Sequence, residues 1–84
     1  MIWVRNARHI KDFQVEVSFN EGTTFRIDLK NELTGEIFRP LRDAKEFSKF
    51  KVHPELETLV WENGADFSPE YLYELGKTQN RQRA

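Results

Sequence analysis

The stretch FQVEVSFNEGTTFRIDL, residues 13–29, alternates apolar and polar side chains on both sides of a break that contains Gly22. A period of two, with β-branched and aromatic residues, is typical of an antiparallel hairpin with one buried face. The break fits a three-residue loop with Gly22 in the left-handed position of a bulge. The residues predicted to face the core are Phe13, Val15, Val17, Phe19, Phe25, Ile27 and Leu29.

The opposite face of this hairpin carries charge. The register we derive from the loop places Glu16 opposite Asp28. Two facing carboxylates can share a proton or hold a metal ion. Arg26 and Lys30 lie diagonally within reach of the pair, so we interpret this face as a solvated ladder of charges.

A second hairpin is predicted in LVWENGADFSPEYLYELG, residues 59–76. Asn63-Gly64 is the strongest short signal for a two-residue hairpin turn, because both positions of that turn need a positive φ. This turn would place Trp61 opposite Asp66. We expect Asp66 to bond a nearby backbone N–H or the indole of Trp61.

A helix is predicted directly after this hairpin. Ser68 supplies an N-cap hydroxyl, Pro69 a preset φ, and Glu70 a negative charge at the positive end of the helix dipole. Gly76 predicts the end of the helix. The sequence therefore predicts one domain over residues 1–76, followed by a polar, disordered tail over residues 77–84.

Shorter signals complete the predicted fold. Residues 2–4 indicate a strand at one edge of the sheet, and Asp43-x-x-Glu46 is a capping-box pattern that starts a short helix. Short strands are predicted around residues 51–53 and over residues 57–62. The expected fold class is α+β. It consists of a small, mostly antiparallel sheet, built from an N-terminal strand plus hairpins, with two short helices packed on one face.

Composition narrows the class of protein. The chain has 84 residues, no cysteine and a formal net charge of −1. The lack of cysteine excludes disulfides and thiolate metal sites, and the balanced charge argues against a dedicated nucleic-acid binder. The opening MIWVRNARHIKD has no continuous apolar run that would indicate a signal peptide or membrane span. We expect a cytoplasmic protein with no membrane association.

No group of residues predicts catalysis. The serines lie outside any Gly-x-Ser-x-Gly elbow, and the four glycines are too scattered to form a phosphate-binding loop. His9 and His53 lack the ligand spacing of a metal site. A small enzyme would need a pocket lined by Glu16, Asp28 or His53. We therefore expect no enzyme activity, no catalytic residue, no metal site and no cofactor.

Two sets of residues are candidates for binding. Trp61, Asp66 and Tyr73 form the predicted contact for a partner protein, because aromatic side chains are enriched at interfaces. The partner is expected to be another small protein or a second copy. The alternative is a nucleic-acid-associated regulator that binds weakly, with strong salt dependence, through basic residues. These are Arg5, Arg8, Lys77, Arg81 and Arg83.

A spaced pattern of residues runs from Asp12-Phe13 to about Leu75. It comprises Val17-x-Phe19-x-x-Gly22, Asp28-Leu29, Phe38-x-x-Leu41-x-Asp43 with Phe47, Trp61-x-Asn63-Gly64-x-Asp66, Pro69-Glu70 and Leu72-Tyr73. In this pattern the chain resembles the bacterial family known as domain of unknown function 2442. Lys11 and Glu62 depart from the family, because proline is common at both positions.

The resemblance implies a small α+β fold and assigns no catalytic residue. The resemblance also implies three contexts in which members of the family occur. A member stands alone, is fused to a helix-turn-helix domain, or is encoded beside a second small protein in an arrangement like a toxin–antitoxin pair. The leading hypothesis is a non-catalytic protein-binding module, in the role of the antitoxin-like partner of that second protein.

Overall fold

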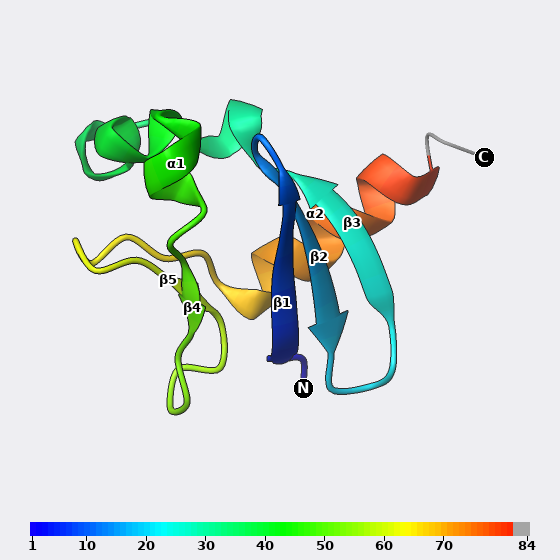
Figure 1. Ribbon diagram of the computed structural model, residues 1–84. Coiled ribbons are helices and arrows are strands. Elements are labelled where there is room, and N and C mark those ends of the chain that lie inside the picture. The colour runs from blue at the N-terminus through cyan, green and yellow to red at the C-terminus, as the bar shows by residue number, and fades with distance from the viewer. Residues whose placement is uncertain (82–84) are drawn as a thin grey trace.

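The computed structural model describes residues 1–81, which form an α+β arrangement of two antiparallel sheets and short helices (Figure 1). The larger sheet has the order β1-β2-β3, and the smaller sheet pairs β4 with β5. The strand bounds are β1 Val4–Lys11, β2 Gln14–Phe19, β3 Thr24–Asp28, β4 Lys51–Val52 and β5 Leu59–Val60. The predicted fold class is confirmed.

The helices lie in the second half of the chain, after two 3-10 segments, η1 (Lys30–Glu32) and η2 (Glu36–Arg42). They are α1 (Ala44–Phe47) and α2 (Pro69–Arg81). Both predicted N-caps are present. Asp43 accepts a hydrogen bond from the N–H of Lys45 at 3.0 Å, and the Ser68 hydroxyl accepts one from Tyr71 at 3.1 Å. These bonds satisfy backbone donors that the first turn of a helix leaves without partners.

The larger sheet has one buried and one open face, as the period of two predicts. Val15, Val17 and Phe19 of β2 are buried on the inner face, together with Ile27 of β3. Figure 1 shows α2 crossing behind the sheet on one side, and α2 packs mainly against β3. The opposite face, formed by the alternating polar residues, is the outer face described below.

The loop between β2 and β3 has the predicted length and a different register. Phe19 and Thr23 are joined by a backbone hydrogen bond of 2.8 Å across residues 20–22, and Gly22 has a φ of 103°. This pairing places Glu16 opposite Arg26, not opposite Asp28. The predicted facing carboxylates are therefore wrong, because Phe19 pairs with Thr23 across the loop, whereas the predicted register requires Phe19 to face Phe25, two residues further along.

The N-terminal strand is longer than residues 2–4 indicated. β1 runs over VRNARHIK and pairs with β2 along its length. Register shifts between Val4 and Asn6 and between His9 and Lys11 interrupt its alternation. A bulge adds a residue to one strand and so breaks the period of two, which is why the pattern did not identify this strand.

The turn after β5 is one residue longer than predicted. Trp61 bonds Ala65 through a 2.9 Å backbone hydrogen bond, and Val60 pairs with Asp66. Gly64 has a φ of 93°, and Asn63 has no positive φ. The prediction of Trp61 opposite Asp66 is therefore wrong, because a three-residue loop with one left-handed glycine replaces the two-residue turn.

The C-terminal helix continues past Gly76 to Arg81, the last residue that the structure describes. The predicted helix end at Gly76 is therefore wrong, and residues 77–81 of the predicted tail belong to α2. Residues 82–84 of that tail lie outside the described residues. Gly76 is buried in the helix, where a Cβ atom would lie 2.5 Å from Cδ2 of Phe25. This glycine is present because α2 approaches β3 closely, not because the helix stops. No helix within residues 1–81 is long and apolar enough to cross a membrane.

Candidate binding site

Trp61, the centre of the predicted partner contact, belongs to the core. Its side chain is only 5% exposed, and its indole N–H donates a hydrogen bond of 2.8 Å to the carbonyl of Phe47. The expected bond from the indole to Asp66 is therefore wrong. Ring contacts surround the indole on several sides: Phe38, Phe47, Phe50 and Phe67 have centroids within 6.3 Å. The ring is therefore almost fully enclosed, and its remaining exposed part lines a hollow with Pro40 and Glu62.

The other two residues of the predicted contact have surroundings that differ from those of Trp61. Tyr73 packs against Phe19, with ring centroids 5.1 Å apart, and its hydroxyl donates to Glu21 at 3.5 Å. Hydrogen bonds from Thr23 lower the pKa of Glu21, with this tyrosine a smaller cause in the same direction. Asp66 is exposed on the strand opposite Val60. The predicted trio does not form one surface.

The outer face of the larger sheet is the clearest uncovered surface with an ordered set of charges. The strand register aligns its side chains in cross-strand rows. In the central row Glu16 lies between Arg8 on β1 and Arg26 on β3, and the Arg8 guanidinium lies 3.4 Å from the carboxylate. Both partners of this ion pair are well exposed, so the pair orients the side chains and contributes little to stability.

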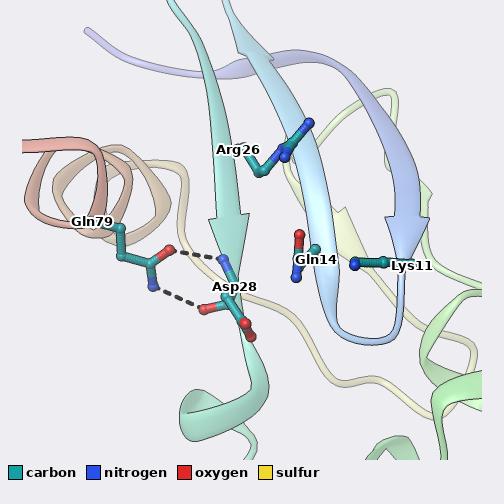
Figure 2. A pocket seen from close by; sticks show the side chains of 5 residues that line it. All are labelled: Lys11, Gln14, Arg26, Asp28 and Gln79. Carbon is teal, nitrogen blue, oxygen red and sulfur yellow. Dashed lines mark hydrogen bonds between the residues drawn. The ribbon is translucent and has the colours of Figure 1, made fainter. Parts of the chain in front are cut away.

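A hollow of about 370 Å³ occupies one end of the outer face, next to the turn between β1 and β2 (Figure 2). Lys11, Gln14 and Asp28 form the cross-strand row beside it, and Arg26 completes the strand-borne lining. Gln79 closes the hollow from α2, because its side-chain amide bonds both backbone groups of Asp28, at 2.8 and 2.9 Å. The lining combines two positive charges with one negative charge and two amides.

The other end of the outer face also carries a basic residue. Arg5 and Asn6 of β1 line a hollow there with Ser18 and Thr24. Arg5 lies at the bulge that follows Val4, which places it beside the polar residues of this face. The outer face is thus defined by ten residues: Arg5, Asn6, Arg8, Lys11, Gln14, Glu16, Ser18, Thr24, Arg26 and Asp28.

The outer face differs in charge from the remainder of the protein. It carries four basic and two acidic side chains, whereas the other described residues include eight basic and twelve acidic ones. The net charge of the whole chain is therefore near zero because a positively charged outer face is offset by a negatively charged remainder. Local charge of one sign attracts partners of the opposite sign, with a screening length of about 8 Å at physiological salt.

The residues of the nucleic-acid alternative divide between this face and elsewhere. Arg5 and Arg8 belong to the outer face. Lys77 lies on α2, 3.6 Å from Glu74, with its ammonium over the ring of Tyr73. Arg81 is the last residue of α2, and Arg83 lies outside the described residues. Sequence reasoning did not include Lys11 and Arg26, although the alternation of β3 already assigned Arg26 to the open face.

The three residues considered for catalysis do not converge. Glu16 and Asp28 are on neighbouring strands, where Glu16 faces Arg26 and Asp28 faces Gln14. His53 lies in the turn after β4, and its Nδ1 accepts hydrogen bonds from the backbone N–H groups of Glu55 and Leu56, both at 3.0 Å. Within residues 1–81, no three His, Asp or Glu side chains are grouped closely enough to hold a metal ion.

Residues 4–78 match the family described as Protein of unknown function (DUF2442). The chain belongs to this family. No protein with a curated description matches this DUF2442 chain in sequence. Among solved structures, it is similar to NE0471 from Nitrosomonas europaea ATCC 19718, whose crystal structure is described as that of a "Putative DNA Binding Protein".

The similarity to NE0471 has a TM-score of 0.84 at 13% sequence identity, and it covers 96% of the DUF2442 chain. The DUF2442 chain spans about half of NE0471, 52% of its length. At this identity the likeness establishes a shared fold and nothing about binding.

Proposed function

We propose that the protein is a non-catalytic binding module that holds another small protein on the outer face of its larger sheet. The observation that supports the proposal is the concentration of positive charge on this open face, whereas the other described residues carry a net negative charge. The complementary partner surface is acidic, and charge complementarity contributes mostly to the rate and specificity of association. In the antitoxin-like role, this partner is the protein encoded beside the chain.

Neutralising the face tests the proposal. The tagged chain is used to recover partners from cells of its source, and proteins are quantified by mass spectrometry. The variant Arg8→Gln/Lys11→Gln removes two positive charges from the outer face, and Lys45→Gln/Lys51→Gln removes two from exposed positions elsewhere. We expect the recovered partner to be several-fold depleted with the first variant and unchanged with the second. Equal recovery with both variants would rule out the outer face.

Nucleic acid is the second candidate for the same face. Two observations favour it. Lys11 and Arg26 lie on the same face as Arg5 and Arg8, and NE0471 is described as a "Putative DNA Binding Protein". Binding to phosphates must weaken steeply as salt rises, because counterions are released. Fluorescence anisotropy of a labelled duplex, titrated between about 50 and 200 mM salt, separates the two functions. A flat or absent response eliminates nucleic acid and leaves the protein partner.

A further inference from the structure

The outer edge of β3 is capped by side chains instead of by a strand. β3 is the last strand in the order β1-β2-β3, so one row of its backbone groups has no strand partner. The last turn of α2 reaches this row. Gln79 accepts from the N–H of Asp28 at 2.8 Å and donates to its carbonyl at 2.9 Å (Figure 2). The Asn80 amide donates to the carbonyl of Arg26 at 3.2 Å.

The bonds of Gln79 reproduce those of a neighbouring strand. In an antiparallel pair, a residue that faces its hydrogen-bonded partner exchanges both an N–H and a carbonyl bond with it. The primary amide of Gln79 makes this same exchange with Asp28. An uncapped edge offers a template for pairing with another chain. The last turn of α2 therefore occupies the position that a fourth strand would take.

The cap is attached by polar contacts. Leu72 and Gly76 bury the earlier part of α2, and Tyr73 packs against Phe19. From residue 77 to 81 the helix carries only polar side chains. Water competes for the amide bonds at this exposed edge, so they hold the last turn weakly. The turn can leave the edge while the first part of the helix stays in place.

The capped edge is complementary to a second copy of itself. Arg26 and Asp28 are two residues apart, both point their backbone groups to the edge, and their side chains have opposite charge. When two β3 strands pair antiparallel about Ile27, Arg26 of each copy faces Asp28 of the other. Each Arg26–Asp28 pair then shares both backbone hydrogen bonds and a side-chain ion pair, which is a favourable cross-strand arrangement.

We propose that the β3 edge is a self-association surface for a second copy of this chain, and that Gln79 and Asn80 keep it closed. Loss of the cap exposes the edge, and two copies join their three-stranded sheets into one through β3. This surface adds the backbone of the β3 edge to the side chains of Arg26 and Asp28, which it shares with the outer face. Arg8 and Lys11, the two residues changed in the test of the partner contact, lie on β1 at the far side of the sheet, so the two proposals can fail independently.

Sedimentation velocity over a range of concentrations tests the proposal with the full chain. The unmodified protein and the control Thr78→Ala, which alters an exposed residue of the same turn, are expected to be monomeric. Gln79→Ala/Asn80→Ala is expected to form a dimer as concentration rises. Adding Arg26→Asp to this uncapped protein places two acids opposite each other and abolishes the dimer. Further addition of Asp28→Arg restores it.

Two results would overturn the proposal. One is an uncapped protein that stays monomeric while its circular dichroism remains native. The other is a dimer that persists unchanged with Arg26→Asp. If Gln79→Ala/Asn80→Ala fails to fold, Gln79→Ala alone serves instead, because it removes both bonds to Asp28 and changes one residue only. A folded, monomeric Gln79→Ala protein would also exclude the self-association surface.

Discussion

The β2–β3 loop (residues 20–22) and the Trp61 loop (residues 62–64) share one backbone design. In each, the residue before the loop bonds the residue after it, at 2.8 Å for Phe19 and Thr23 and at 2.9 Å for Trp61 and Ala65. In each, the N–H of the final glycine bonds back to the carbonyl of the residue before the loop, at 3.0 Å. Gly22 and Gly64 have similar positive φ values of 103° and 93°.

What surrounds the two loops is different. The β2–β3 loop joins strands of six and five residues with a continuous ladder. The Trp61 loop follows a strand of only two residues, and its hairpin is held by the buried indole and the Asn63 side chain. The comparison shows that a local loop geometry can be stabilised by a regular ladder or by core anchors. We expect mutations to distinguish these two kinds of support.

Trp61→Ala gives the largest expected effect, because it removes the anchor of the second hairpin. It deletes a buried ring that contacts four other rings and leaves the carbonyl of Phe47 without its donor. We expect a loss of about 3–5 kcal/mol in the free energy of unfolding, measured by urea denaturation. Trp61→Phe, which keeps ring packing, should lose clearly less. Equal losses would show that packing is not the main contribution of the indole.

Gly76→Ala tests how α2 is held against the first hairpin. The added Cβ would lie 2.5 Å from Cδ2 of Phe25, so the helix or the ring must shift. We expect a loss of about 1–3 kcal/mol in the same assay, in spite of the higher helix propensity of alanine. Thr78→Ala, an exposed substitution in the same helix, should be close to neutral. A stabilised Gly76→Ala protein would contradict the close approach.

Alanine at Gly22 and at Gly64 compares the loops directly. Neither new Cβ meets a neighbour closer than 3.9 Å, so the cost arises from the positive φ alone. We expect each substitution to lower the free energy of unfolding by about 1–2 kcal/mol, and the two losses to agree closely. A much larger loss at Gly64 would mean that the Trp61 loop depends on its backbone geometry more than the comparison indicates.

The asparagine of each loop ties a distant segment to it. Asn20 accepts from the N–H of Trp3 at 2.8 Å and donates to the carbonyl of Met1 at 3.0 Å. Asn63 accepts from the N–H of Ala65 at 3.1 Å and donates to the carbonyl of Ile37 at 2.8 Å. Alanine at either position should cost about 0.5–1.5 kcal/mol. Hydrogen exchange should then accelerate near residues 1–3 for Asn20→Ala and near residues 36–38 for Asn63→Ala.

Two tyrosines of α2 contact the two hairpins, and the smallest expected effect concerns one of them. Tyr73 packs against Phe19 of the first hairpin, and Tyr71 stacks on Phe67 of the second. The Tyr71 hydroxyl donates to Glu32, and this bond, with burial as a smaller cause, raises the pKa of Tyr71 above the usual 10.0. Its stabilising contribution is therefore complete below pH 10 and is lost as the pH rises through the folded-state pKa.

Absorbance titration of the phenols checks this pKa. Tyr71→Phe should remove a component that ionises later than the ordinary phenol, whereas Tyr73→Phe should retain it. Glu32→Gln removes the charge that disfavours the phenolate and should bring the component back toward the usual value. A titration curve that is the same in Glu32→Gln and in the unmodified chain would contradict the role of Glu32.

The first hairpin and the helix start at Ser68 could be predicted from sequence because local rules govern them. Alternation identified the inner face of β2 and β3, and the φ requirement of Gly22 identified the loop. The bulges of β1 concealed a strand of eight residues, since each bulge disturbs the period that reveals a strand. The burial of Trp61 could not be predicted from the candidate site, because it depends on residues such as Phe47, far from it in sequence.

The sequence by itself determined the α+β class, the position of the first hairpin, both helix N-caps and the residues that turn toward the core. These features follow from spacing, side-chain type and backbone φ, which act over a few residues. Only the tertiary structure decided that Trp61 is buried, that Gly76 marks a contact and not a helix end, and that Arg5, Arg8, Lys11 and Arg26 share one face. These depend on which strands pair and in what register, and pairing brings together residues that no local pattern connects.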